Sequence, residues 1–357
     1  MGEKEFSAHC WPTAIGSLPH QDPEEACHLM LRYFPLIPLW PQLPKRSFRE
    51  NMYVQYSKGF PGVVLTDDER IYVDRSADLS SQLEKLYTAY IEQDTTNFAL
   101  EADYAAGLHF LLGRDFRALT RLGAGTPLAI KGQVTGPISW GLTVTDQDRR
   151  AVLYDEVLAD AIAKHLRLSA IWQEKALQQI HPQTIVFIDE PYMSAYGSAF
   201  VSLQREQVIT LLEEVFQGLE GLTGIHCCGN TDWSLLVETS VDILNLDAYN
   251  HAESLSLYPE AIDAFLRRGG IIAWGIVPVS PERLANETAE SLVGRLEQAM
   301  GLLVKKGIGF DNLVRHCLIT PACGLGTVSV DNATRALELT AQVAAEMRRR
   351  YFTEVPS

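Results

Sequence analysis

The run Leu222-Thr223-Gly224-Ile225-His226-Cys227-Cys228 is the clearest indication of the fold, because it is largely apolar without strict alternation of apolar and polar residues. A polar turn, a helical pattern and a second run of this kind, Val241–Asp247, follow it. Continuous apolar runs are typical of parallel strands whose outer face is covered by helices. The stretch therefore predicts a strand–helix–strand unit of an α/β protein.

The same arrangement recurs along the chain, where short apolar runs alternate with helical patterns. These patterns are clearest over 155–180, 281–306 and from Asp331 onward. Eight strands with intervening helices indicate a single (β/α)8 TIM barrel. The other runs that we expect to form strands are Pro12–Ser17, Phe34–Leu39, Leu128–Val134, Thr184–Asp189, Gly270–Ile276 and Cys317–Pro321.

The segment between the second and third predicted strands is too long for one crossover. It contains a predicted hairpin, Gly62–Leu65 with Arg70–Val73, and helical patterns from Ser80 onward. We interpret residues 41–125 as an insertion after strand two that covers the barrel mouth. Because no internal repeat or linker is visible, we expect residues 1–357 to form one domain.

Composition and charge exclude several classes of protein. The chain has 357 residues, of which 46% are hydrophobic and 21% charged, which is typical of a folded globular protein. Its net charge of −15 disfavours binding to nucleic acid and to anionic membranes. The sequence contains neither a signal-peptide core nor a run of about 18 apolar residues. We therefore expect a cytoplasmic protein.

A histidine and two cysteines are placed to bind a metal. Residues two apart on a strand face the same side, so His226 and Cys228 point into one site while Cys227 points toward the helices. Cys323 follows the last strand, whose end faces the same barrel mouth. An imidazole and two thiolates suit Zn²⁺ and leave a fourth position for substrate. Three other cysteines are expected to be buried small residues, namely Cys10, Cys27 and Cys317.

These segments resemble the zinc motifs of the catalytic domain of cobalamin-independent methionine synthases, through His226–Cys228 and Pro321–Leu325. The continuation Cys228–Thr231 is also similar to corrinoid-dependent thiol methyltransferases of the uroporphyrinogen decarboxylase superfamily. Full-length synthases carry a second barrel, so the resemblance is to the shorter core form. Further motifs match in the same order, namely Ile15–Pro19, Thr135–Pro137, Ile188–Pro191 and Trp274–Ile276.

The resemblance implies a TIM barrel in which zinc activates a small thiol, homocysteine in the synthases, for methylation. His226, Cys228 and Cys323 would hold the metal. In the synthases a glutamate of the next strand adds a ligand. Here that strand ends in Asp247, which either binds zinc or acts behind the ligands.

The resemblance also assigns the amino-acid part of the substrate. Ser17 and the backbone of Ile15 and Gly16 would bind the carboxylate, and Asp189 would bind the ammonium group. Glu190 is a further candidate for substrate binding. A second glutamate of the family aligns loosely here, with Glu50 or Gln55 as its counterpart.

The expected methyl donor is inferred from a difference between this sequence and the folate-using synthases. Folate-using synthases carry a proton-transferring histidine before a Ser-Pro pair, whereas 275–281 here contains neither His nor Asp. Methyltetrahydrofolate needs protonation and methylcobalamin does not, so we expect a methylated corrinoid, on a carrier protein, as donor. If His20 or His251 served as the acid, folate would remain the alternative.

Two other functions stay open. A decarboxylase of the uroporphyrinogen type needs an arginine-rich cleft for the carboxylates of its substrate. The only early basic cluster consists of Lys45, Arg46 and Arg49. A non-catalytic zinc- or thiol-binding accessory protein would bind zinc without turnover.

Overall fold

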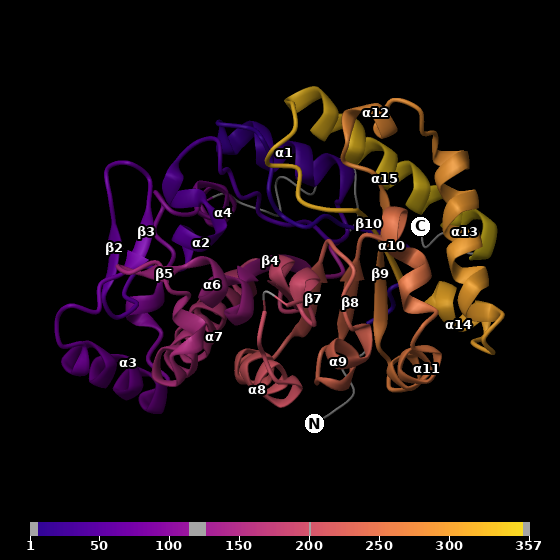
Figure 1. Cartoon of the computed structure of the whole chain (residues 1–357). Coiled ribbons are helices and arrows are strands. Elements are labelled where there is room, and N and C mark those ends of the chain that lie inside the picture. The colour runs from indigo at the N-terminus through magenta and orange to yellow at the C-terminus, as the bar shows by residue number, and fades with distance from the viewer. Residues whose placement is uncertain (1–5, 114–125, 200, 353–357) are drawn as a thin grey trace.

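The computed structural model describes residues 6–113, 126–199 and 201–352. Its main sheet has seven strands in the order β1-β10-β9-β8-β7-β6-β4, and all neighbouring strands are parallel (Figure 1). This arrangement confirms an α/β fold with a curled parallel sheet. The strands are β1 (Trp11–Pro12), β4 (Ile130–Thr135), β6 (Thr184–Asp189), β7 (Leu222–Cys227), β8 (Ile243–Leu246), β9 (Ile271–Val277) and β10 (Cys317–Pro321).

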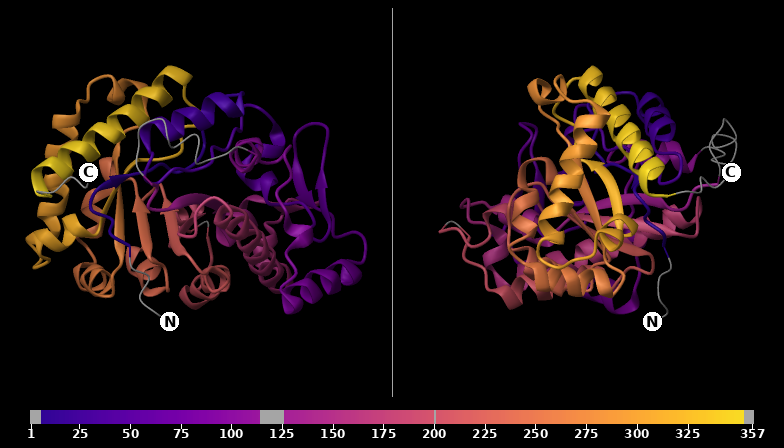
Figure 2. Two further views of the ribbon diagram at one scale, coloured as in Figure 1. Left: turned by 180° about the vertical axis from the view of Figure 1, so that it is seen from behind. Right: turned by 90° about the vertical axis from the view of Figure 1, so that its right-hand side faces the viewer.

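Helices cover the outer face of the sheet (Figure 2). The long helix α7 (Glu156–Gln178) is an example. Asp155 caps its amino end, because the Asp155 side chain accepts the N–H of Leu158. Its predicted apolar stripe, at Leu158, Ile162, Leu166 and Ala170, is buried. The other helices that follow strands are α8 (Arg205–Phe216), α9 (Trp233–Glu238), α10 (Ala248–Leu255), α11 (Pro259–Arg267), α13 (Ala289–Val304), α14 (Phe310–Arg315) and α15 (Val330–Tyr351).

A small apolar cluster fills the inside of the curled sheet toward the amino ends of the strands. Inward positions two apart on a strand contribute to it, such as Ile185 with Phe187 and Ile271 with Ala273. The polar residues that follow on the same strands therefore lie above an apolar floor. Cys227 belongs to the larger core between sheet and helices, so it points outward as predicted.

The predicted second strand is not regular among the described residues, and the main sheet has seven strands instead of the eight of a closed barrel. Residues 36–42 form only isolated parallel bridges, Leu39 with Lys131 on one side and Gln42 with Ser17 on the other. Prolines at 35, 38 and 41 explain this, because each removes a backbone N–H that a regular strand would donate. The predicted first strand is likewise reduced to Trp11–Pro12.

The segment expected to be an insertion contains the predicted hairpin. Its strands, β2 (Val63–Leu65) and β3 (Ile71–Val73), are antiparallel, and β5 (Thr145–Asp146) pairs with β3. Residues 114–125 lie outside the described residues. The described helices of this region are α2 (Met52–Gln55), α3 (Ser80–Glu92) and α4 (Ala106–Leu112), whereas α1 (Pro23–Tyr33) precedes it and α6 (Pro137–Thr143) follows β4.

The helix predicted over 281–306 is two helices. The first, α12, spans only Pro281–Leu284, and α13 starts afresh after Thr288. The Thr288 hydroxyl accepts the N–H of Ser291, whose side chain bonds back to the Thr288 N–H, so a capping box separates the two helices.

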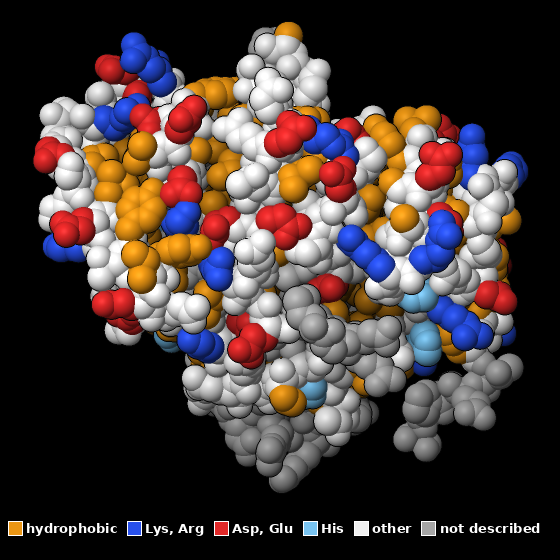
Figure 3. All heavy atoms as spheres, turned by 90° about the horizontal axis from the view of Figure 1, so that it is seen from below, with side chains coloured by type: hydrophobic (Ala, Val, Ile, Leu, Met, Phe, Trp, Pro, Cys, Tyr) orange, Lys and Arg blue, Asp and Glu red, His pale blue; other side chains and the backbone are white. Residues whose placement is uncertain are grey.

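One face of the molecule shows how charged side chains are distributed on the surface (Figure 3). On the face shown in Figure 3, acidic and basic side chains are interspersed, and neither sign forms a continuous field. Among the described residues, every helix is too short or too polar to cross a bilayer.

Candidate metal centre and pocket

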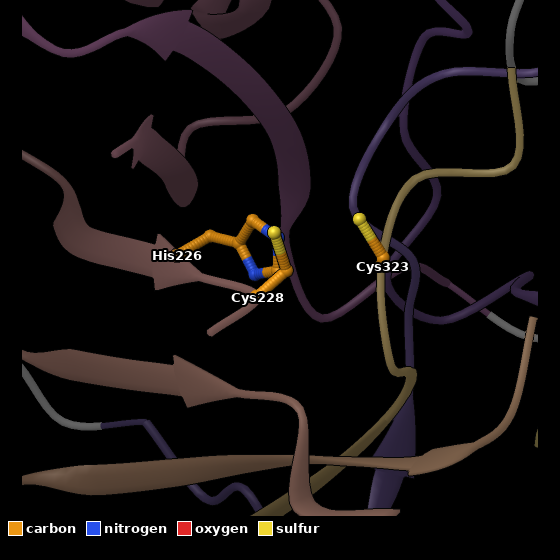
Figure 4. A group of neighbouring side chains, drawn as sticks. All are labelled: His226, Cys228 and Cys323. Carbon is orange, nitrogen blue, oxygen red and sulfur yellow. The ribbon is translucent and has the colours of Figure 1, made fainter. Parts of the chain in front are cut away.

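The three predicted ligands come together at the carboxyl ends of the strands. His226 lies on β7, Cys228 follows that strand directly, and Cys323 lies just beyond β10 (Figure 4). The ligand atoms of all three are within 4.8 Å of one another. Strands β7 and β10 are separated by β8 and β9, so the curl of the sheet brings the two segments together.

The three side chains change one another's pKa values. Hydrogen bonds from Cys323 and His226 lower the pKa of Cys228, while the same bond to Cys228, together with burial, raises the pKa of Cys323. Burial acts to lower the pKa of His226. The hydrogen bond to Cys228 and the charges of Cys228 and Asp189 act in the opposite direction and are larger together, so the pKa of His226 is raised. One sulfur of the pair is therefore readily available as a thiolate.

This donor set fits a zinc ion. One imidazole nitrogen and two sulfurs are the ligand types that Zn²⁺ prefers, and catalytic zinc sites use three protein ligands. Asp247, the fourth candidate, stands outside this group of three. Its carboxylate accepts hydrogen bonds from the backbone and side chain of Asn250 at 2.9 and 2.6 Å, so it caps helix α10.

A cavity of about 270 Å³ opens beside the three ligands. Its wall includes two carboxylates, Asp189 and Glu50, and the amide of Gln42. None of the described residues that line it is a lysine or arginine, so the cavity favours a cationic group over an anionic one.

Asp189 is the acidic group best placed to bind a substrate. Its residue is only 5% exposed, and its Oδ1 has no hydrogen-bond partner among the described residues. Burial raises its pKa to about 6, although His226 and Lys131 act in the opposite direction. A buried carboxylate oxygen without a donor is an energetically costly arrangement that a bound ammonium group would relieve.

The predicted carboxylate-binding segment lies at the same cavity. Ile15 and Ser17 line it, while Gly16 is packed against two glutamine side chains. Ser17 also supports the loop of Cys323, because its carbonyl accepts the N–H of Leu325 at 2.9 Å and its hydroxyl that of Gly326 at 3.2 Å. Lys131 donates from Nζ to the Ile15 carbonyl at 2.6 Å, which fixes this segment from below.

Several predicted residues do not face the cavity. Glu190 is fully buried and accepts hydrogen bonds from the first turn of α6. Neither His20 nor His251 lines the cavity. Of the two candidates for the second glutamate, Glu50 lines the cavity but accepts from the Leu43 N–H and Arg46. Gln55 instead accepts from Gln42.

The early basic cluster is engaged elsewhere. Arg46 pairs with Glu50, Arg49 pairs with Asp103, and the Nζ of Lys45 donates to the Val328 carbonyl at 2.7 Å. The three side chains therefore do not form an anion-binding cleft over the site.

The residues around the site that the sequence did not predict include Lys131, Gln42 and Asn245. Lys131 and Asn245 stand within otherwise apolar strands, β4 and β8. Their position inside a buried apolar run could have indicated that they belong to a site, because a buried polar residue needs a buried hydrogen-bond partner. Gln42 follows a proline-rich segment whose path between β1 and β4 the sequence pattern does not define.

Comparisons with known proteins give a structural match without a sequence match. No family model matches the chain, and no curated protein matches its sequence. Its structure is similar to that of a B12-independent methionine synthase from Shewanella sp. W3-18-1 in complex with selenomethionine. The TM-score is 0.58 at 16% identity, over 97% of this chain and 99% of that one. The chain has the fold of that synthase.

A second solved structure agrees. A methyltransferase from Methanosarcina mazei matches with a TM-score of 0.56 and 13% identity, over 97% of this chain and 94% of that one. Both matches accord with the family resemblance that the sequence motifs carry, and they cover nearly the whole chain.

Proposed function

We propose that the protein is a thiol S-methyltransferase of the methionine synthase type, in which His226, Cys228 and Cys323 hold zinc. The acceptor is homocysteine or a related small thiol, and the donor is a methylated corrinoid on a carrier protein. The observation that carries this proposal is the convergence of the three ligands and the Asp189 carboxylate on one cavity. The fold shared with a methionine synthase and a methyltransferase supports the reaction class.

Different residues of the cavity would bind different parts of the substrate. Zinc, when bound, would lower the pKa of the substrate thiol so that its sulfur is nucleophilic at neutral pH. Asp189 would accept the ammonium group of the substrate, and the segment from Ile15 to Ser17 would hold its carboxylate. In the transfer, the sulfur–carbon bond forms as the carbon–cobalt bond of the donor breaks. The electron pair stays on the corrinoid, and the thiol proton leaves to solvent.

The choice of a corrinoid donor rests on the lack of a free imidazole among the described residues that line the cavity. Among the described residues that line the cavity, the only imidazole is that of His226, which belongs to the metal site. The segment from Gly275 to Pro281 contributes no acidic side chain. Methylcobalamin needs no proton for methyl transfer, so this cavity suits it better than methyltetrahydrofolate.

Methionine formation from homocysteine tests the proposal. The zinc-loaded protein should react with methylcobalamin and far less with methyltetrahydrofolate. Cys228→Ser should lose both zinc and turnover, whereas Cys27→Ser, which changes a buried thiol on α1, should keep both. A wild-type protein that retains no zinc refutes the metal site, and a zinc-loaded protein inactive with both donors refutes the substrate assignment.

The same assay addresses the two alternatives. Stable zinc binding without turnover on any small thiol would favour the accessory-protein function. A decarboxylase acting on a polycarboxylate is disfavoured by a cavity whose described wall holds Asp189 and Glu50 but no cation.

A further inference from the structure

A chain of polar contacts crosses four adjacent strands below the candidate metal site. The register of the sheet places His226 on β7 opposite Asn245 on β8, and Asn245 opposite Ala273 on β9. The Nδ1 of His226 lies 2.5 Å from the Oδ1 of Asn245. The Nδ2 of Asn245 donates to the Ala273 carbonyl at 2.7 Å and to the Thr320 hydroxyl, on β10, at 2.9 Å.

The orientation of the Asn245 amide is fixed by these partners. A carbonyl oxygen only accepts hydrogen bonds, so the group facing Ala273 must be the NH₂ of the amide. The amide oxygen therefore faces His226, and it can only accept. The hydrogen of the neutral imidazole is thereby assigned to Nδ1, which leaves the lone pair of the other ring nitrogen for Cys228 or a metal.

The hydrogen bonds of Asn245 are also shielded from water. Asn245 and Thr320 are fully buried, and His226 is 3% exposed. An unpaired polar atom at this depth would cost about 1–3 kcal/mol, so the network holds the imidazole in one orientation. Because Thr320 lies three residues before Cys323, the same network joins the strands that carry both halves of the ligand set.

We propose that Asn245 is a positioning residue of the metal site, which sets the tautomer and orientation of His226 through its amide oxygen. Thr320 and the Ala273 carbonyl in turn orient Asn245. This inference rests on the proposed function only in that His226 binds a metal; it requires neither a methyl donor nor an acceptor. Residues that orient a ligand histidine typically change metal affinity by about 10- to 100-fold when they are replaced.

Two substitutions separate positioning from space filling. Asn245→Asp keeps an acceptor for the His226 N–H but places a carboxylate in the core, whereas Asn245→Leu preserves the volume and removes the acceptor. If the acceptor matters, Asn245→Leu should weaken Co²⁺ and Zn²⁺ binding by about 10- to 100-fold, and Asn245→Asp should bind more tightly than Asn245→Leu. If Asn245 only fills space, the order should be reversed, since leucine is the better core residue.

The measurement is metal affinity of the full-length protein by competition with a chelator, together with the visible spectrum of bound Co²⁺. The spectrum should change in Asn245→Leu, because the imidazole is no longer held in one orientation, and should change less in Thr320→Val. Gln173→Met is the matched control, because Gln173 is a buried amide that bonds the backbone of Gln133 and the Trp40 indole instead of His226. Its affinity and spectrum should equal those of the wild type.

The outcomes are distinct. Wild-type affinity and spectrum in Asn245→Leu would overturn the inference while leaving the proposed function intact. A wild-type protein that binds neither metal would remove the site and this inference with it. Full metal binding with the expected variant order, in a protein that methylates no thiol, would sustain the inference and refute the proposed function.

Discussion

The carboxylate of Glu190 closes the first turn of helix α6, with its Oε2 2.7 Å from the backbone nitrogen of Ser139. Its Oε1 accepts the N–H of Ile138 at 2.9 Å, and the Ser139 hydroxyl donates to Oε2 at 2.6 Å. The adjacent residue, Asp189, faces the cavity from the end of β6. The two neighbouring acids therefore differ in their surroundings: Glu190 caps a helix, whereas Asp189 is available to a ligand.

Replacement of Glu190 should affect stability before it affects substrate binding. Glu190→Ala leaves two buried backbone N–H groups and one hydroxyl without their acceptor, so we expect a loss of about 2–4 kcal/mol in the free energy of unfolding. Urea denaturation measures this loss. Zinc content and the KM for the thiol should stay within about threefold of wild type in the folded variant. A large rise in KM without loss of stability would return Glu190 to the substrate site.

Replacement of Asp189 should have the opposite profile. Asp189→Asn keeps the shape of the side chain but removes the charge that would pair with a substrate ammonium, so kcat/KM for homocysteine should fall by about 10- to 100-fold. Zinc content should not change. A small thiol without an amine provides the control, because its kcat/KM should be similar in both proteins. An equal loss for both thiols would show that Asp189 does not bind an ammonium group.

The sequence predicted that His226, Cys228 and Cys323 lie close together better than it predicted the strands of the barrel. The prediction that His226 and Cys228 face one site requires only the two-residue period of a strand. The prediction that Cys323 joins them requires only that parallel strands end at one edge of the sheet. The region around 34–42 could not be predicted in this way, because its apolar residues fit a strand while its prolines remove the donors that a strand needs. Its actual path depends on long-range contacts, such as the bridge from Gln42 to Ser17.

Gly16 should not tolerate a side chain. A Cβ at this position would lie 2.7 Å from the Cδ of Gln133 and 3.0 Å from the Oε1 of Gln42. A shift of either glutamine would disturb a contact, since the amide of Gln133 contacts the Trp40 carbonyl at 3.4 Å and that of Gln42 donates to Gln55 at 2.6 Å. Gly16→Ala should therefore cost about 1–3 kcal/mol and raise the KM for the thiol.

The matched control for this substitution is Gly294→Ala. Gly294 lies within helix α13, and a Cβ there would meet nothing within 4 Å. Alanine is the better helix former, so this variant should be neutral or more stable by about 0.5–1 kcal/mol. If both variants unfold at the same urea concentration as wild type, the close packing around Gly16 is not a constraint on the cavity.

A buried histidine far from the ligands should govern part of the acid sensitivity. His165, on α7, is packed between the rings of Phe60 and Phe98, and its Nε2 lies 2.7 Å from the Tyr56 carbonyl. Burial lowers its pKa from 6.5 to about 4. Between these values the unfolded chain binds a proton that the folded chain does not, so the free energy of unfolding falls as the pH falls. The contribution of His165 is on the order of 3 kcal/mol across this window.

His165→Gln isolates this contribution, because the amide can still donate to the Tyr56 carbonyl but does not titrate. Urea denaturation of both proteins between pH 7 and pH 4 should show a steeper loss of stability in the wild type. The difference between the two curves should grow as the pH falls below about 6.5 and level off below about 4. Parallel curves would contradict this prediction, because they would mean that the folded protein protonates His165 as easily as the unfolded chain does, despite its contacts with two phenyl rings.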